Sequence, residues 1–168
     1  MRKLVFVLLV LVAFSPALFA QKVGIEAGYS FLHAGSPFNL NANGFEVQPM
    51  FMVTKHFAVL ADFSGQYATF PMAGPGHLYT YLFGPSYVLP VGKFARMNVH
   101  YLFGGATLGE GPFPTENAFA MAPGGALDFK VAKHVWIRPA EVDYVITHFG
   151  GAYQDKNVRY GAGLLFMF

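Results

Sequence analysis

Hydrophobic and polar residues alternate along most of this chain with a period of two. From Val23 onward, segments with this period are separated by short breaks rich in Gly, Pro, Asn or Lys. A period of two indicates β-strands, because successive side chains of a strand point to opposite faces. The pattern predicts eight strands, approximately at Val23–His33, Asn43–Thr54, His56–Ala68, His77–Leu89, Lys93–Thr107, Asn117–Lys130, His134–Thr147 and Asn157–Phe168.

The two faces of each predicted strand differ in chemistry. In the last segment one face carries Val158, Tyr160, Ala162, Leu164, Phe166 and Phe168, and the other mixes Arg159 with small residues. A soluble sandwich would instead place many Lys and Glu side chains on its water-facing side. A lipocalin-like cup would turn these aromatic side chains inward. Sparse polar residues fit the inside of a narrow barrel, so the apolar face is expected to contact lipid.

The composition supports a membrane environment. The chain is 54% hydrophobic and only 12% charged, whereas soluble domains are about 25% charged. After residue 20 every apolar stretch is too short for a membrane-spanning helix. A closed barrel also satisfies all backbone hydrogen bonds in lipid. The predicted fold class is therefore all-β, an eight-stranded antiparallel up-and-down transmembrane β-barrel.

The first 20 residues resemble a secretory signal peptide. Arg2 and Lys3 precede the apolar run Leu4–Phe14, and Ala20 is a suitable last residue of the leader. This predicts a signal peptide over 1–20 and a barrel over 21–168; cleavage after Ala17 and an uncleaved anchor are the alternatives. Export combined with a barrel predicts the outer membrane of a Gram-negative bacterium.

The breaks between segments also alternate in length. Tight turns are expected around Lys55, 90–92 and 132–133, and longer loops at 34–42, 69–76, 108–116 and 148–156. Short turns at one end and long loops at the other are typical of outer-membrane barrels. We expect the long loops to face outside the cell.

The inward phase of the strands predicts a polar network that fills the lumen, because eight strands enclose a space just wide enough for side chains. Isolated charges there would be costly, so they should pair. The predicted members are Glu26, Glu46, Asp62, Arg96, His100, Asp128, Glu141, Asp143 and Arg159, with Lys130 as a further candidate.

Two irregularities stand out. Arg138 falls on the lipid side of its strand unless a β-bulge at Pro139 and Ala140 resets the phase, and the alternative is that it extends to the membrane interface. Pro49, Pro85 and Pro123 lie in mid-strand and remove ladder donors, which predicts bulges or weakened pairing.

The sequence offers little for other functions. There is no cysteine, and the 11 basic residues are scattered, which argues against thiol chemistry and nucleic-acid binding. His100, Ser64 and Asp62 do not form a recognisable catalytic arrangement. We therefore predict no catalytic residues, no metal site and no cofactor.

The terminal strand NVRYGAGLLFMF, with Phe168 as its last residue, resembles that of bacterial outer-membrane barrels. The mature chain resembles the small, porin-like, eight-stranded barrels of the outer-membrane protein A transmembrane type. The resemblance implies that Tyr160, Leu164, Phe166 and Phe168 form an insertion signal for the barrel assembly machinery. It also implies contact with outer-membrane lipid and lipopolysaccharide, and we expect a monomer.

These features predict a non-enzymatic protein of the cell envelope with a structural or surface-contact role. Its polar, plugged lumen should conduct small ions weakly at most. A lipid A-modifying enzyme, either an acyltransferase or a deacylase, is the first alternative, and a narrow channel for small solutes is the second.

Overall fold

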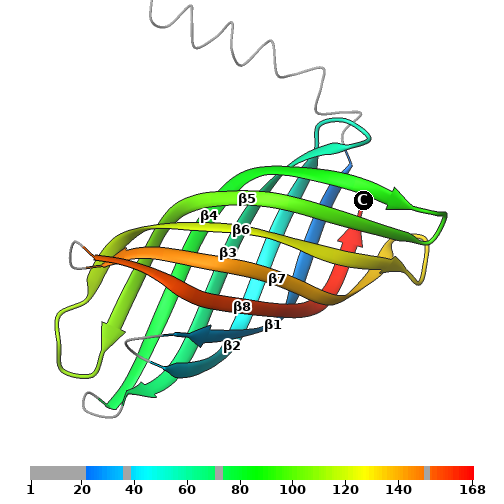
Figure 1. Cartoon of the computed structure of the whole chain (residues 1–168). Coiled ribbons are helices and arrows are strands. Elements are labelled where there is room, and N and C mark those ends of the chain that lie inside the picture. Colours follow the sequence, from blue (N-terminus) through cyan, green and yellow to red (C-terminus); the bar gives the residue numbers. More distant parts are fainter. Residues whose placement is uncertain (1–21, 36–38, 71–73, 150–151) are drawn as a thin grey trace, which may run out of the picture.

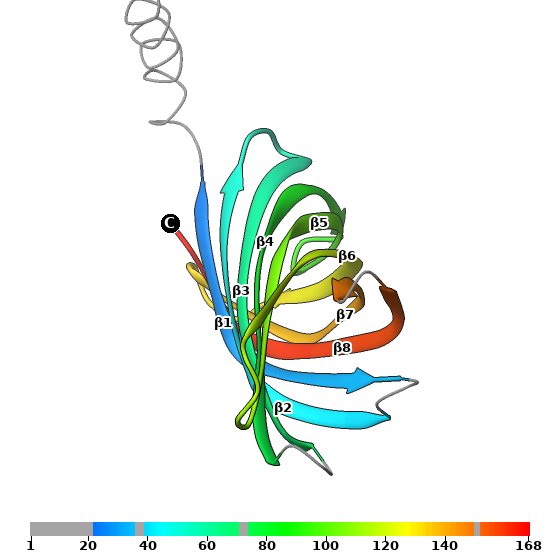
Figure 2. The same cartoon turned by 90° about the vertical axis from the view of Figure 1, so that its left-hand side faces the viewer.

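The computed structural model describes residues 22–35, 39–70, 74–149 and 152–168. Eight antiparallel strands form a closed barrel in which each strand pairs with its neighbours in sequence (Figures 1 and 2). The strands are β1 (Val23–Ala34), β2 (Leu40–Met52), β3 (Phe57–Phe70), β4 (Gly74–Val91), β5 (Ala95–Glu110), β6 (Glu116–Lys130), β7 (Val135–Phe149) and β8 (Ala152–Met167). Pairing of β1 with β8, from Gly24 opposite Met167 to Ala34 opposite Asn157, closes the sheet. The predicted fold is confirmed.

In the part of the chain described, no helix has the length and apolarity to cross a membrane. The predicted signal peptide, residues 1–20, lies outside the described residues.

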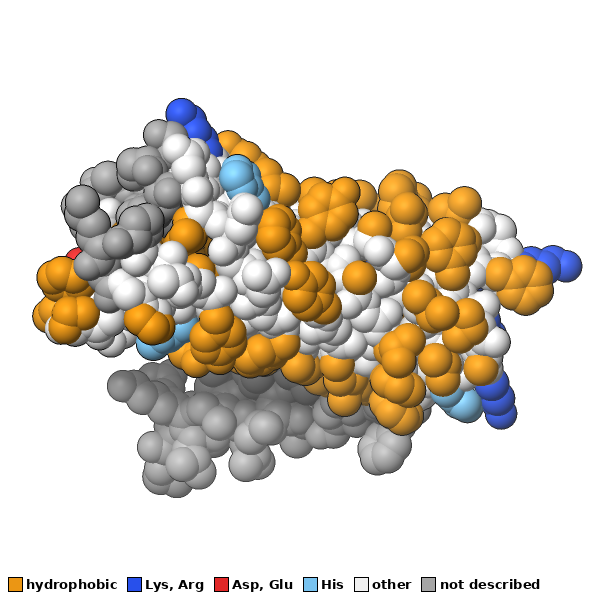
Figure 3. All heavy atoms as spheres, turned by 90° about the horizontal axis from the view of Figure 1, so that it is seen from below, with side chains coloured by type: hydrophobic (Ala, Val, Ile, Leu, Met, Phe, Trp, Pro, Cys, Tyr) orange, Lys and Arg blue, Asp and Glu red, His pale blue; other side chains and the backbone are white. Residues whose placement is uncertain are grey.

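Side chains alternate across the barrel wall as the period of two predicts. Tyr29 and Phe63 point outward and are 52% and 51% exposed, whereas their inward neighbours Ser30 and Asp62 are fully buried. Space-filling atoms show hydrophobic side chains spread over the barrel wall (Figure 3). A wall of this kind is stable only when it is covered by something apolar.

The strands extend further than predicted at the loop end. β3 and β4 stay paired up to Phe70 opposite Gly74, and β5 and β6 up to Leu108 opposite Glu116. Residues 69–70, 74–76, 108–110 and 116 of the predicted loops 69–76 and 108–116 are therefore in strands, and the prediction of long loops over these full ranges was wrong. Pro75 and Gly76 are paired with Thr69 and Ala68 near the end of the β3–β4 hairpin. Proline is tolerated close to the start of a strand more readily than in its middle.

The opposite end has the tight turns that were predicted. Gly92 adopts a φ of 79° in the turn between β4 and β5, a left-handed conformation that glycine reaches without strain. In the turn before β3, the backbone amides of His56 and Phe57 donate to Thr54 Oγ1 at 3.2 and 3.0 Å. Val23, where β1 begins, and Met167, where β8 ends, also lie at this turn end.

The mid-strand prolines weaken the ladder without shifting it. Pairing of β2 with β3 skips the positions of Gln48 and Pro49, and the register is the same on both sides of the gap. The same gap occurs at Pro85 between β4 and β5, and at Pro123 between β6 and β7. Each proline therefore removes local pairing, and no bulge forms there.

The bulge alternative for Arg138 is the one observed. The β7–β8 register shifts between Arg138 and Glu141, so Pro139 and Ala140 add one residue to the strand. This restores the inward phase on both sides of the bulge, and Arg138 is only 1% exposed. The side chain enters the lumen and does not extend to the interface.

The lumen is polar only in part, whereas the prediction was a polar, plugged lumen. Its middle contains the charged residues, whereas its loop end contains inward-facing aliphatic and aromatic side chains such as Leu32, Ala106 and Phe149. These residues follow the same period of two as the charged residues. The period determines which side chains point inward, but it does not determine whether they are polar.

Candidate functional site

All nine residues predicted for the interior network are inside the barrel. Each is at most 8% exposed, and together they come from seven of the eight strands: Glu26, Glu46, Asp62, Arg96, His100, Asp128, Glu141, Asp143 and Arg159. Lys130 is exposed at the turn end, so it is not part of this network.

Arg159 on β8 connects opposite walls of the lumen. Its Nη1 and Nη2 donate to the two carboxylate oxygens of Asp62 on β3 at 2.9 and 2.7 Å. Its Nε and Nη2 donate to Asp143 Oδ2 on β7 at 3.0 and 2.5 Å. Nη1 also donates to Ser64 Oγ at 2.8 Å. One guanidinium therefore bridges two carboxylates with charge-assisted hydrogen bonds, which are stronger than neutral ones.

Arg138 forms a second junction next to the first. Its Nε donates to Asp128 Oδ1 at 2.7 Å, and its Nη1 donates to Glu141 Oε2 at 2.6 Å. Nη1 also donates to Gln48 Oε1 at 2.7 Å. The Gln48 amide donates in turn to Asp62 Oδ2 and Glu141 Oε1, which joins the two arginine clusters. Arg96 completes the layer with a 2.9 Å bond to Asp128.

Gln48 was missed by the sequence reasoning although it lies on the inward phase of β2. Only charged residues and a histidine were predicted for the network, so this uncharged amide was left out. The available signal was its position opposite Glu26 on β1. An amide there provides both a donor and an acceptor for charged neighbours. It is 1% exposed, and its hydrogen bonds link three strands of the barrel.

His100 contacts the network without forming a hydrolytic triad. His100 Nε2 lies 2.7 Å from Asp143 Oδ1, and Nδ1 lies 3.2 Å from Asn98 Oδ1. A triad needs a serine hydroxyl on one imidazole nitrogen. Ser64 instead bonds to Thr80 Oγ1 at 2.6 Å and to Arg159. Among the described residues, no serine hydroxyl bonds to His100.

Two sets of buried side chains have the composition of metal sites. Ligand atoms of His100, Glu141 and Asp143 lie within 4.8 Å of one another, as do those of Glu46, Asp62 and Glu141. However, the oxygens of Asp62 and Glu141 already accept hydrogen bonds from arginine and Gln48. Guanidinium groups beside these oxygens would repel a cation, so the arrangement favours an ion-pair network over a metal centre.

The buried charges do not balance. Within the described residues, the buried set contains six carboxylates, three guanidiniums and one imidazole. Glu26 and Glu46 have no hydrogen bond to either carboxylate oxygen, and Glu46 Oε2 is 3.9 Å from Arg159 Nε. Each of these carboxylates packs against a glycine of β8. If Gly163 carried a Cβ, that atom would lie 2.0 Å from Glu26 Oε1, and a Cβ on Gly161 would lie 2.0 Å from Glu46 Oε1, so a larger residue at either position would displace the carboxylate.

Because Glu26 lacks a partner, Glu26→Gln is expected to leave the free energy of unfolding unchanged within about 1 kcal/mol, or to raise it, since an unpaired buried charge is unfavourable. Urea unfolding of the protein in lipid vesicles measures this. Asp62→Asn is the matched variant, since Asp62 accepts both Arg159 and Gln48, and we expect it to lose about 3 kcal/mol. Equal losses for the two variants would contradict the assignment.

The ion-pair network lies between two hollows at the ends of the lumen. At the turn end a funnel of about 790 Å³ is lined by five lysines, which are Lys22, Lys55, Lys93, Lys130 and Lys133. Arg96 and Trp136 lie at its inner limit, with the guanidinium carbon 4.5 Å from the ring centroid. At the loop end an apolar pocket stops at Gln66 and Asn157. The ion pairs lie between the two.

Three residues of the predicted insertion signal, Tyr160, Leu164 and Phe166, lie on the outward face of β8, and Phe168 follows the strand directly. All four are exposed. Aromatic side chains also meet near the loop end of the wall, where the Tyr67 and Tyr79 hydroxyls are 3.0 Å apart. Such pairs are typical of the aromatic belts at membrane interfaces.

The fold is shared with solved outer-membrane barrels. Neisserial surface protein A has a TM-score of 0.69 and 12% identity, and the match covers 88% of this chain and 97% of that one. Ail of Yersinia pestis, in complex with the heparin analogue sucrose octasulfate, has a TM-score of 0.57 and 16% identity over 88% and 99% of the chains. The N-terminal barrel domain of Pseudomonas aeruginosa OprF has a TM-score of 0.53 and 15% identity over 88% and 97%.

This chain therefore has the fold of the small eight-stranded outer-membrane β-barrels. No protein-family model matches it, and no curated protein matches it in sequence.

Proposed function

We propose that this protein spans a bacterial outer membrane as a closed, non-conducting and non-enzymatic barrel with a structural or surface-contact role. The observation that carries the proposal is the ion-pair network, which joins β7 and β8 to β2 and β3 across the lumen. The apolar outer wall and the fold shared with outer-membrane barrels support the location.

In the proposed orientation the turn end faces the periplasm. The outward side chains contact lipid and lipopolysaccharide, Tyr160, Leu164, Phe166 and Phe168 serve as the signal for the barrel assembly machinery, and the protein acts as a monomer. The loop end would then be the surface for external contacts.

A ligand with many negative charges would require basic residues at the loop end of the barrel, and this protein has mostly acidic ones there. Glu110, Glu116 and Asp155 lie there together with Lys156, whereas five lysines are at the turn end. Binding of a sulfated ligand such as the one bound to Ail is therefore not extended to this protein, because its loop end is acidic.

Conductance in planar lipid bilayers tests the closed lumen. We expect no stable conductance steps, because a path for ions would require Arg159 to leave Asp62 and Asp143. Arg159→Ala is the informative comparison, since it removes the side chain that crosses the lumen. Large and stable steps from the unmodified protein would overturn the proposal.

A further inference from the structure

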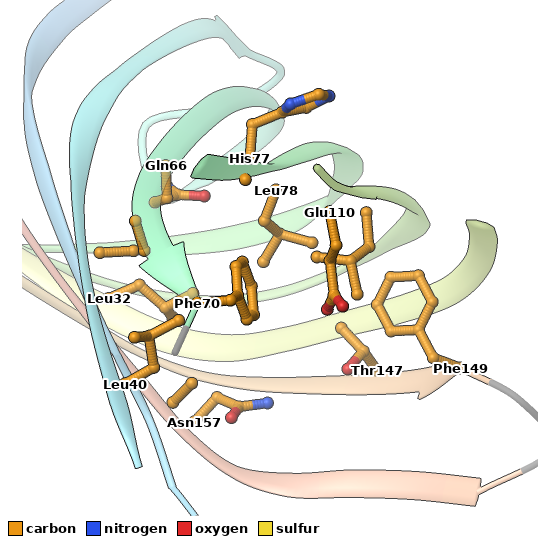
Figure 4. A pocket seen from close by; sticks show the side chains of 15 residues that line it. Leu32, Leu40, Gln66, Phe70, His77, Leu78, Glu110, Thr147, Phe149 and Asn157 are labelled. Atoms are coloured by element: carbon orange, nitrogen blue, oxygen red, sulfur yellow. The ribbon is translucent and has the colours of Figure 1, made fainter. Parts of the chain in front are cut away.

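An apolar pocket occupies the loop end of the lumen, and the proposed function does not use it. Its walls include Leu32, Leu78 and Leu108, with the rings of Phe70 and Phe149 opposite one another across the opening (Figure 4). It is narrow, with a cavity volume of about 50 Å³. Small residues at inward positions, such as Ala42 and Ala68, leave this space unfilled.

Glu110 places a carboxylate among these apolar side chains. It is partly buried at the end of β5, and Figure 4 shows its carboxylate directed into the pocket between Phe70 and Phe149. Within the described ranges, no hydrogen bond or ion pair joins this carboxylate to another side chain. A carboxylate between two aromatic rings attracts a cation, both by its charge and by the negative faces of the rings.

The pocket lies where the ladder between β2 and β3 has ended. Pairing of β2 with β3 ends at Asn43 opposite Tyr67. Beyond this point Leu40–Ala42 pair only with β1, and Ala68–Phe70 pair only with β4. Side chains of both segments, Leu40 and Ala42 on one side and Ala68 and Phe70 on the other, line the pocket.

We propose that this pocket binds a small hydrophobic cation, consisting of an apolar body and one ammonium group. The aliphatic walls bury the body of the ligand, and Glu110, Phe70 and Phe149 hold the ammonium group. The Gln66 amide, which donates to Ser30 Oγ at 3.1 Å, forms part of the closed floor and stops the ligand above the charged network. This inference is independent of whether the barrel conducts.

The test uses n-hexylammonium, with the uncharged 1-hexanol as its matched partner. The full barrel in nanodiscs of zwitterionic lipid carries labelled leucine methyl groups, and NMR shifts of Leu32, Leu78 and Leu108 report the pocket. Leu164, on the lipid-facing wall, reports simple partitioning into the membrane. We expect saturable shifts at the pocket leucines, and about tenfold tighter binding of hexylammonium than of hexanol.

Two variants separate the roles of charge and space. Glu110→Gln should equalise the affinities of the two probes, whereas Glu116→Gln, an exposed carboxylate at the same end, should leave the preference intact. Ala68→Phe should abolish the shifts for both probes by filling the pocket. Equal affinities in the unmodified protein, a preference that survives Glu110→Gln, or shifts at Leu164 alone would overturn the proposal.

Discussion

Replacing Arg159 with methionine is expected to lower the free energy of unfolding by about 3 to 5 kcal/mol, because it leaves buried carboxylates without their countercharge. Arg159 is 2% exposed and holds Asp62 and Asp143 through four hydrogen bonds. Methionine retains much of the length of the side chain but none of its donors. Urea unfolding of the refolded protein in lipid vesicles measures the loss.

Lys156→Met is the control, since Lys156 lies three residues earlier on the same strand and is exposed. It should change the free energy of unfolding by less than about 0.5 kcal/mol. Adding Asp62→Asn and Asp143→Asn to the methionine variant should restore part of the stability, because these changes remove the unpaired charges. A methionine variant as stable as the unmodified protein would show that the network does not hold the barrel together.

Phe63→Arg is expected to destabilise the barrel by about 2 to 4 kcal/mol, the cost of a cation at the middle of a bilayer on a lipid-facing position. Phe63 is 51% exposed and lies between Phe57 and Tyr67 on the outward face of β3. In a water-soluble protein, a half-exposed phenylalanine could become arginine at little cost. The size of the effect therefore reports which solvent surrounds the wall.

Val53→Arg serves as the position control because Val53 is 54% exposed but lies in the turn before β3. Near the interface the same substitution should cost about 0 to 1 kcal/mol. Two equal and small effects in lipid vesicles would contradict the proposed depth of the β3 wall.

The architecture was predictable because the barrel wall imposes a period of two on every strand. Alternation placed Glu26, Asp62 and Arg159 inside and Phe63, Leu164 and Phe166 outside, and the structure has them there. Alternation alone could not decide whether Arg138 faces the lumen or the lipid. One extra residue in the strand reverses the phase, and the sequence does not show whether a bulge is present at Pro139 and Ala140.

The apolar loop end of the lumen was missed for a different reason. Leu32, Leu78 and Leu108 are on the inward phase in the sequence, but only the polar inward residues were predicted to meet in the lumen. Alternation determines which way a side chain points, but it does not determine which side chains of the opposite strands it contacts. The pairing of Arg159 with Asp62, 97 positions apart in the chain, likewise depends on closure of the sheet and was beyond any local pattern.

Depth-dependent fluorescence quenching tests most directly whether hydrocarbon touches the outward side chains. Phe63→Trp in a Trp136→Phe background provides a single tryptophan on the wall, since Trp136 is the only native one. In vesicles of lipids brominated at different chain positions, we expect strong quenching that is greatest for bromines near the middle of the bilayer. Fluorescence unaffected by every brominated lipid would contradict the membrane-spanning barrel.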